Sequence, residues 1–290
     1  MKAFIFPGQG SQFPGMGSDL KEISKAKEMF DTANEILGFN ICNIMFDGSV
    51  DELKQTKVTQ PAIFIHSIIL SNIIPNFKPD MVAGHSLGEI SALTAAKVIS
   101  FQEGLELVKT RSQAMQIACE NNNSTMAAVL QLDEKIIEDI CKKIKGIVVP
   151  ANYNCPGQVV ISGELNSVKT ACDKMIKKGA RRAILLPVGG AFHSPIMNSA
   201  KEKLANKIKE ISFKNPICPI YQNVCGNPIK DTDALKANLI EQLVSPVRWT
   251  ETIKNMIKNG ANDFTEIGPG KVLQGLVKKI NSNVSISTDF

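Results

Sequence analysis

Short apolar runs alternate with longer segments of helical periodicity along most of the chain. The runs have the length of buried strands and occupy residues 2–6, 80–84, 219–224 and 263–268. The segments between them space their apolar residues as helices do, and they include 59–70, 101–118, 195–209, 247–259 and 271–280. Alternating strands and helices of this kind predict an α/β fold, in which helices cover both faces of a parallel sheet.

From residue 125 onward the pattern changes. Its segments read strand 125–130, helix 133–144, strands 146–154 and 157–163, helix 166–179 and strand 180–188. This βαββαβ order is the ferredoxin-like unit. We therefore predict an α/β-hydrolase-like large domain (1–123 and 190–290) with an inserted ferredoxin-like small subdomain (124–189), entered through the polar turn at 120–124.

Composition narrows the class of protein. The 290 residues are 43% hydrophobic, enough for a substantial core, and 33 Lys and Arg against 28 Asp and Glu give a formal charge of +5. No arginine-rich stretch accompanies this mild excess, so nucleic acid is not predicted, although an acidic partner would be attracted. The seven cysteines form no C-x-x-C pair and are expected to be reduced thiols rather than metal ligands. No apolar run suits a signal peptide or a membrane span, so we expect a cytoplasmic protein.

Ser86 stands in the pattern GHSLG (84–88), directly between a predicted strand and a predicted helix. Flanking glycines allow the backbone to turn sharply there, so that the serine hydroxyl is exposed as in a nucleophile elbow. The pattern alone also fits a glycine-rich helix start that Ser86 merely caps. It leaves these two interpretations about even.

A serine nucleophile needs a base, and the chain has three histidines. His66 lies on a helix that is apolar nearly all round, which indicates a core histidine with satisfied polar atoms. His85 adjoins Ser86, and adjacent side chains leave a turn in different directions, so it is expected to support the elbow. His193 follows a predicted strand and is the favoured base. Asp173, the best-spaced acid, resembles a solvated helix face, so a backbone carbonyl is the alternative partner for the imidazole.

Arg111 is unusual because its helical neighbours are Leu107, Val108 and Met115, which place its stem on the apolar face. A buried arginine is seldom tolerated without an anion. The spacing fits a structural ion pair with a glutamate and a fork for a substrate carboxylate equally well.

Seven motifs in order resemble those of the malonyl-CoA:acyl carrier protein transacylase family, over essentially the whole chain. They are FPGQGSQ near the N-terminus, TQPA (59–62), GHSLGE, Arg111 followed by MQ (115–116), GAFHSP, SPVRW (245–249) and EIGPGKVL (266–273). The resemblance implies a ferredoxin-like subdomain where we predict one. It also implies transfer of a malonyl group from malonyl-CoA, through a serine ester, to the phosphopantetheine thiol of an acidic acyl carrier protein, without a cofactor.

Carried over by position, the resemblance implies a set of site residues. Ser86 would be the nucleophile, His193 the base and Arg111 the ligand of the malonyl carboxylate. The backbone carbonyl of Gln242 would orient His193. The remaining positions are the amides of Gln9 and Leu87 as oxyanion hole, His85 and Asn154 near the site, and Phe192, which goes with malonyl selection in the wider family.

Three other functions stay open at this point. A discrete malonyl-specific acyltransferase of a polyketide synthase has similar motifs, although the length of 290 residues favours the free-standing enzyme. A non-catalytic docking module would not need Ser86, His193 and Arg111 together. A serine hydrolase would not need the arginine. The basic stretches 142–145 and 177–182 are candidates for docking the carrier, or are simply solvated helix ends.

Overall fold

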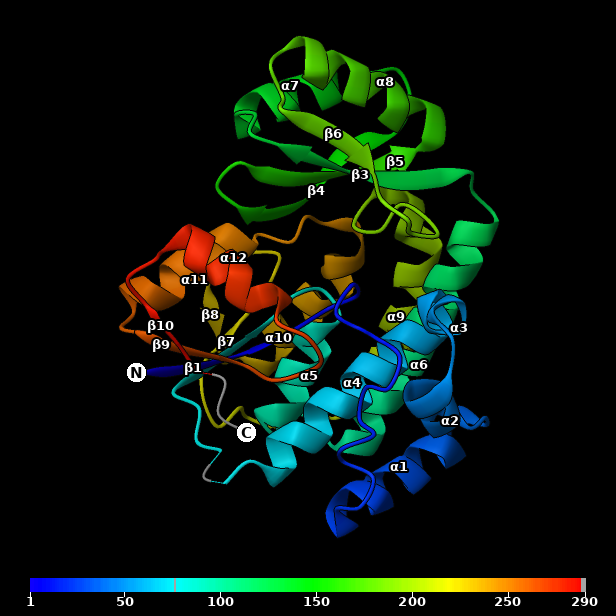
Figure 1. The fold of residues 1–290 in the computed structure, drawn as a ribbon, viewed down its shortest axis with the longest axis vertical. Coiled ribbons are helices and arrows are strands. Elements are labelled where there is room, and N and C mark those ends of the chain that lie inside the picture. Colours follow the sequence, from blue (N-terminus) through cyan, green and yellow to red (C-terminus); the bar gives the residue numbers. More distant parts are fainter. Residues whose placement is uncertain (76, 288–290) are drawn as a thin grey trace.

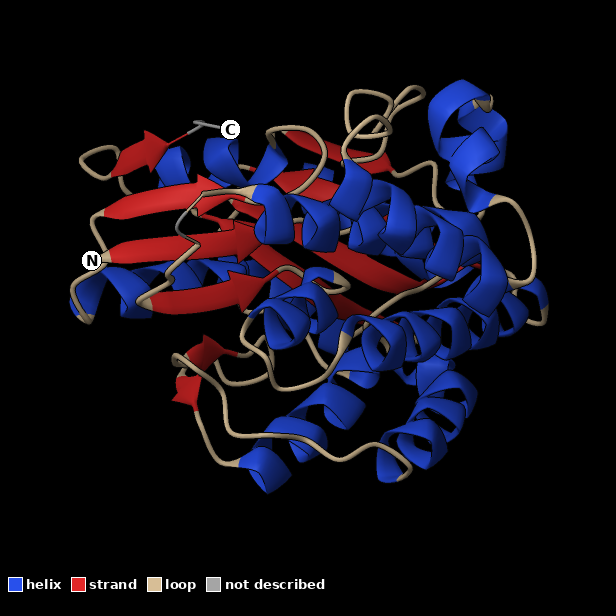
Figure 2. Ribbon diagram, turned by 90° about the horizontal axis from the view of Figure 1, so that it is seen from below, coloured by secondary structure: helices blue, strands red, loops and turns tan. Residues whose placement is uncertain are grey.

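The large sheet has six strands, in the order β10-β9-β1-β2-β7-β8 (Figure 1). We describe the chain from a computed structural model covering residues 1–75 and 77–287. All neighbours from β10 to β7 pair in parallel, and β8 pairs antiparallel with β7. Figure 2 shows the longer strands of this sheet running side by side from the end of the molecule marked N. The strands are β1 (Lys2–Phe6), β2 (Met81–Gly84), β7 (Ile220–Tyr221), β8 (Pro228–Ile229), β9 (Asp263–Glu266) and β10 (Ser285–Ser287).

Helices cover both faces of this sheet, because its strands are apolar on both sides. In β1, Phe4 and Phe6 join one buried cluster, whereas Ala3 and Ile5 join another on the opposite face. The second cluster contains α11 (Trp249–Lys258) and α12 (Val272–Ile280). The first contains α1 (Ser24–Leu37), α2 (Ile41–Asp47), α3 (Val50–Lys54), α4 (Thr56–Ile73), α5 (Gly88–Ala95), α6 (Phe101–Glu120), α9 (Asn198–Lys209) and α10 (Thr232–Glu241). The predicted α/β class is confirmed.

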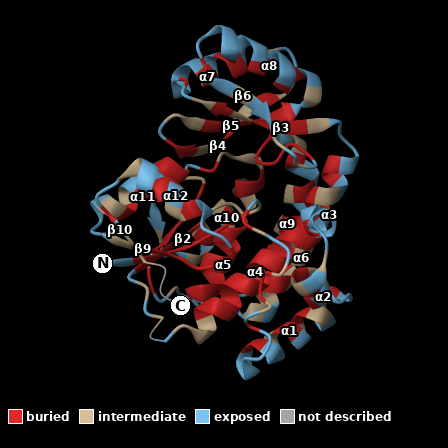
Figure 3. Ribbon diagram, in the orientation of Figure 1, coloured by how far each residue is buried: buried red, intermediate tan, exposed pale blue. Residues whose placement is uncertain are grey.

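The helices α4 and α6 lie against each other in the core, where Figure 3 shows buried residues in red. Ser100 and Glu103 form a capping box that begins α6. Further along α6, a Cβ atom on Gly104 would lie 2.7 Å from the ring of Phe64 on α4. The glycine therefore permits an approach that a larger residue would prevent. This close packing fixes the relative positions of the two helices.

The small sheet has four antiparallel strands in the order β4-β5-β3-β6. Two helices cover its outer face, whereas Met126, Ala151 and Val160 on the other face join the core of the large domain. The elements are β3 (Ser124–Leu130), α7 (Glu134–Lys142), β4 (Val148–Cys155), β5 (Gln158–Glu164), α8 (Leu165–Lys177) and β6 (Arg182–Leu185). They follow the predicted βαββαβ order. We propose 124–189 as the bounds of the small subdomain.

The free edge of β4 is joined to the large domain by a short ladder. The amide of Tyr153 donates to the carbonyl of Val247 at 2.9 Å, and the amide of Val247 donates to Ala151 at 2.8 Å. Asn152 and Val247 thereby form an isolated parallel bridge. Hydrogen bonds of the backbone therefore connect the small sheet to the segment that precedes α11 in the large domain.

Several predicted elements differ from those observed. Strand 180–188 shortens to β6, since Pro187 has no amide hydrogen to donate. Strand 219–224 shortens to β7, because the chain turns after Tyr221 and the amide of Asn223 bonds to a side chain. The first turn of helix 195–209 is the 3-10 turn η1 (Pro195–Met197). The elements α10, η2 (Gln242–Val244), β8 and β10 were missed, and no separate bounds were predicted for α1, α2 and α3.

Candidate active site

Ser86 lies at a sharp bend between β2 and α5. Its φ of 54° is in the left-handed region, which is strained for a residue other than glycine. A Cβ atom on Gly84 would lie 1.9 Å from the carbonyl of Gly88, and one on Gly88 would lie 2.0 Å from the carbonyl of Phe6. Both glycines are therefore sterically required. The N-cap of α5 is Leu87, and no side chain caps this helix, so the structure shows a nucleophile-elbow geometry and not a serine cap.

His193 connects Ser86 to Gln242. Its Nε2 atom lies 2.8 Å from the Ser86 hydroxyl oxygen, and its Nδ1 atom lies 2.8 Å from the backbone carbonyl of Gln242. Because a carbonyl only accepts, Nδ1 carries the proton and Nε2 is free to accept from Ser86. Burial, together with the charge of Arg111, lowers the pKa of His193 to about 3. The imidazole is consequently neutral at neutral pH, which a base requires.

Arg111 is fully buried on α6. Its Nη1 atom donates to Gln60 at 2.7 Å, and its Nη2 atom donates to the Ser86 hydroxyl and to Gln242 Oε1, both at 3.1 Å. Its Nε atom has no partner, and no ion pair in the described part of the chain includes this residue. Burial lowers the pKa of Arg111 only to about 10, so the group stays cationic. Among the described residues no glutamate lies within ion-pair distance of Arg111, although the nearby charge of Glu89 partly offsets the lowering of its pKa.

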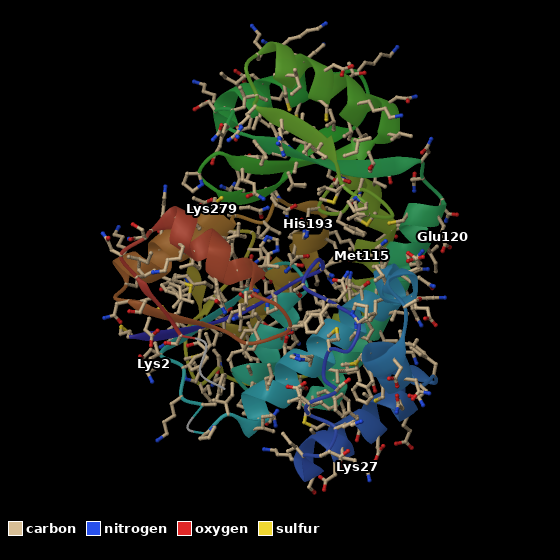
Figure 4. All side chains as sticks on the ribbon, in the orientation of Figure 1. Lys2, Lys27, Met115, Glu120, His193 and Lys279 are labelled. Carbon is tan, nitrogen blue, oxygen red and sulfur yellow. The ribbon has the colours of Figure 1, made fainter. Side chains whose placement is uncertain are left out.

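These groups open into a cleft of about 170 Å³ between the large domain and the inner face of the small sheet. Figure 4 labels His193 and Met115, which both lie at this junction. Across the described residues, the amides of Gln9 and Leu87 donate no hydrogen bond, so they remain available as donors. The cleft is lined by Gln9, Gln60, His85, Ser86, Leu87, Arg111, Met115, Met126, Asn152, Asn154, Val160, Leu186, Val188, Phe192 and His193.

The other predicted residues also lie near Ser86. His85 Nε2 is 2.9 Å from Asn154 Oδ1, and its ring meets Trp249 edge to face at a centroid distance of 5.4 Å. Phe192 is buried in the cleft wall. His66 lies in the core as predicted, but its Nδ1 atom has no partner among the residues described, so the expectation of satisfied polar atoms is wrong. Burial lowers the pKa of His66 to about 4.

Sequence reasoning missed three buried polar residues around the site. Gln60 accepts from Arg111, Asn223 accepts from the Ser86 amide, and Glu89 accepts from the Asn223 amide. Gln60 and Glu89 are within the motifs TQPA and GHSLGE, and each is a polar residue among apolar neighbours. That contrast was a usable signal. Asn223 offered none, since it looked like the end of a strand.

Basic side chains of 142–145 and 177–182 line two different hollows, and the second stretch is divided between them. Lys143, Lys177 and Lys178 line one of about 480 Å³ between the outer helices α7 and α8. Arg181 and Arg182 line another, of about 330 Å³, beside Lys279 of α12. The structure therefore separates the arginines from the lysines.

Three further features concern metal binding, the state of the cysteines and membrane-spanning helices. Within residues 1–75 and 77–287, there is no group of three or more His, Cys, Asp or Glu side chains that would suit a metal ion. The cysteines are free, and six of the seven are buried. In the same ranges, no helix combines the length and the apolar character that crossing a bilayer demands.

Comparison with known proteins places the chain in a family. The model of the acyl transferase domain matches residues 3–287. The malonyl CoA-acyl carrier protein transacylase of Bacillus subtilis (strain 168) is 43% identical over 288 residues, which cover 96% of this chain and 90% of that protein.

Solved structures are similar over almost their full length. The malonyl CoA-acyl carrier protein transacylase of Coxiella burnetii superposes with a TM-score of 0.94 at 37% identity, covering 98% of this chain and 92% of that one. A malonyl-transacylase in complex with its type II polyketide synthase acyl-carrier protein gives 0.95 at 38% identity, covering 98% and 94%. The chain therefore belongs to the acyl transferase domain family, among the malonyl CoA-acyl carrier protein transacylases.

Proposed function

We propose that the protein transfers the malonyl group of malonyl-CoA to the phosphopantetheine thiol of an acyl carrier protein, through an ester on Ser86. One observation carries the proposal. The Ser86 hydroxyl lies between a neutral imidazole at 2.8 Å and a buried guanidinium at 3.1 Å that has no carboxylate partner in the described chain. A base and an unpaired cation at one hydroxyl suit acyl transfer with an anionic acyl group.

In the first half-reaction, the Ser86 oxygen attacks the thioester carbonyl of malonyl-CoA while His193 Nε2 takes the hydroxyl proton. The negative charge that develops on the carbonyl oxygen is stabilised by the amides of Gln9 and Leu87. The carbon–sulfur bond then breaks, and the leaving thiolate of CoA receives the proton from His193. The products are the malonyl ester of Ser86 and free CoA.

In the second half-reaction, the thiol of the carrier protein enters the same cleft. His193 removes the thiol proton, and the sulfur attacks the ester carbonyl. The ester bond to Ser86 breaks, and the proton returns to the serine oxygen. Every proton in this scheme moves through His193, so the scheme needs no cofactor.

Arg111 selects the acyl group. The malonyl carboxylate stays ionised at neutral pH, and a buried anion requires a fixed cation. The guanidinium is held by Gln60 and Gln242, so its fork is in place before the substrate arrives. Phe192 lies in the wall of the cleft, where its ring leaves less room for larger, branched acyl groups.

Fatty acid synthesis is the proposed pathway, and the cytoplasm is the proposed location, because the free thiols suit a reducing compartment. A polyketide carrier is the second candidate. It is supported by the similarity to a malonyl-transacylase that binds the acyl-carrier protein of a type II polyketide synthase. The chemistry at Ser86 is the same for both carriers.

Mass spectrometry of the protein mixed with malonyl-CoA, without carrier, tests the proposal. A stable malonyl ester on the peptide that contains Ser86 is the expected result. Addition of phosphopantetheinylated carrier protein should remove it and produce malonyl-carrier. Steady release of free malonate without carrier would instead identify a hydrolase.

A further inference from the structure

A single asparagine side chain joins the two backbone segments on either side of the bend. Asn223 follows β7, and it is fully buried. Its Oδ1 atom accepts from the Ser86 amide at 2.7 Å, and its Nδ2 atom donates to the Gly84 carbonyl at 2.6 Å. The carboxamide thus makes the two contacts that the peptide group of a neighbouring strand would make.

The bend requires such a support. The ladder between β2 and β7 ends at the pair Ala83 and Tyr221, before the chain reaches Gly84. The Ser86 amide also precedes α5 and has no acceptor within the helix. Since a φ of 54° persists only where the surroundings hold it, loss of the bond to Asn223 would free the peptide to rotate toward a relaxed conformation.

Glu89 in turn holds Asn223. The Asn223 amide donates to Glu89 Oε2 at 2.7 Å, and the side chain of the preceding Gln222 donates to Glu89 Oε1 at 3.2 Å. Glu89 belongs to α5, the helix that begins at the bend, and is fully buried. The carboxyl group of Glu89 therefore connects the loop after β7 to the helix that begins at the bend.

The other side of the bend is held in a similar way. Gln242 Nε2 donates to the Ser86 carbonyl at 3.0 Å and to Asn223 Oδ1 at 3.4 Å. Side-chain amides thus fix both the N–H and the C=O of Ser86. The carbonyl of Gln242 also sets the ring of His193, so the two partners of the proton transfer share one network.

We propose that Asn223 is a positioning residue for the Ser86 nucleophile and that Glu89 positions Asn223. The inference rests on the proposed role of Ser86. Asn223 does not line the cleft, so it does not contact the substrate there. Its role is to hold the serine oxygen in position relative to His193 and to the amides of Gln9 and Leu87. A displaced nucleophile slows the attack and leaves substrate binding intact, which separates this role from a binding role.

The test uses the full chain with Asn223→Ala and two measurements. One is single-turnover acylation by malonyl-CoA, and the other is the rate at which a fluorophosphonate, which needs neither CoA nor a carboxylate, modifies Ser86. We expect both rates to fall about 10- to 100-fold while the KM for malonyl-CoA changes by less than about 2-fold.

Asn255→Ala is the matched control. Its side chain likewise donates to a backbone carbonyl in the loop after β7, that of Gly226 at 2.9 Å, but makes no bond to the bend. The control should lose some thermal stability and keep both rates. Wild-type rates in Asn223→Ala, or an equal loss of rate in the two variants, would overturn the proposal.

Two further outcomes are also decisive. If Asn223→Ala does not fold, Asn223→Asp replaces it, because the carboxylate keeps the size and the acceptor but cannot donate to Gly84. A fall in both rates is expected again, and wild-type rates would overturn the proposal. If wild-type protein reacts with the fluorophosphonate and not with malonyl-CoA, the proposed function fails, and the fluorophosphonate rates still decide the role of Asn223.

Discussion

The Nη2 atom of Arg111 lies 3.1 Å from the hydroxyl oxygen of Ser86, so the cation touches the oxygen to which we propose the acyl group is attached. A carboxylate that pairs with this fork must therefore lie close to the ester carbonyl. Malonyl, in which a single methylene separates the two carbonyl groups, meets that requirement. A longer diacid would carry its carboxylate past the fork.

Arg111→Ala should change what is transferred more than whether transfer occurs. The malonyl carboxylate would lose its buried cation at a cost of about 3 kcal/mol or more, roughly 10²-fold in kcat/KM. Acetyl-CoA brings no charge and should lose little or even gain. Arg111→Lys should restore only part of the malonyl activity, because an ammonium lacks the bidentate fork. The measurement is the malonyl-to-acetyl ratio of kcat/KM, with a thermal melt. A parallel fall for both substrates together with a lower Tm would mean that Arg111 is structural.

Ser86→Ala should abolish both acylation by malonyl-CoA and transfer to the carrier. Loss of a nucleophile from a coupled pair lowers kcat by about 10⁴- to 10⁶-fold. Intact-mass spectrometry and a carrier-transfer assay check this, and the Tm should stay near that of the wild type because the side chain is small. Any substantial transfer by this variant would remove Ser86 from the mechanism.

The protonation of His193 should not limit the rate where histidines ordinarily titrate. The base must be neutral, and burial lowers the pKa of His193 to about 3, so the neutral form persists well below pH 6.5. We expect the protonation of His193 to have no effect on kcat/KM for malonyl-CoA between pH 8 and about pH 5. Burial raises the pKa of Glu89 to about 7, so a change in rate near that pH reports the Glu89 network, and an acid limb near pH 6.5 that persists in Glu89→Gln would show that the imidazole is exposed to solvent during catalysis.

Stability is a poorer readout of that pKa. Between pH 6.5 and the lowered pKa values of His193 and His66, only the unfolded chain takes up protons at these residues. Their contribution to the free energy of unfolding therefore falls as the pH falls. Burial raises the pKa of Glu89 and of Glu266 to about 7, and the folded chain takes up protons there first. The two effects oppose each other, so the pH profile of the rate is the cleaner measurement.

Much of the fold followed from periodicity because each strand and helix buries a continuous stripe or face of its own. The elbow at Ser86 and the loop of His193 were also predictable, since local glycines and the end of a strand mark them. The side-chain amides that support the bend at Ser86 were not predictable. Asn223 reaches Ser86 from 137 residues away, and no spacing rule connects them. The partner of an amide depends on how the elements pack, which one sequence does not display.

Docking of the carrier should depend on the arginines rather than on the lysines of the second basic stretch. Arg181 and Arg182 share a hollow with Gln158, which lies two residues from the cleft residue Val160 on β5. Replacing both arginines with alanine should raise the KM for an acidic carrier about 10-fold, and higher salt should raise it in the wild type much more than the KM for malonyl-CoA.

The control is the variant in which Lys177 and Lys178 are both replaced with alanine, since it removes the same charge from the outer face of the small subdomain. It should change the KM for the carrier less than about 2-fold, because only a general loss of positive charge remains. Equal changes in the two double variants would mean that net charge, and not a defined surface, attracts the carrier.

The ladder between β4 and Val247 constrains how substrates can be exchanged. Val247 lies five residues after Gln242, whose carbonyl accepts a hydrogen bond from His193, so a movement of the small sheet away from the large domain would strain the segment that holds the base. We therefore expect these two hydrogen bonds to limit how far the small sheet can move away from Ser86. Coenzyme A and the pantetheine arm of the carrier react at the same cleft of about 170 Å³, so they must bind there one after the other. Sharing of one cleft would thereby impose the alternation of loading and unloading.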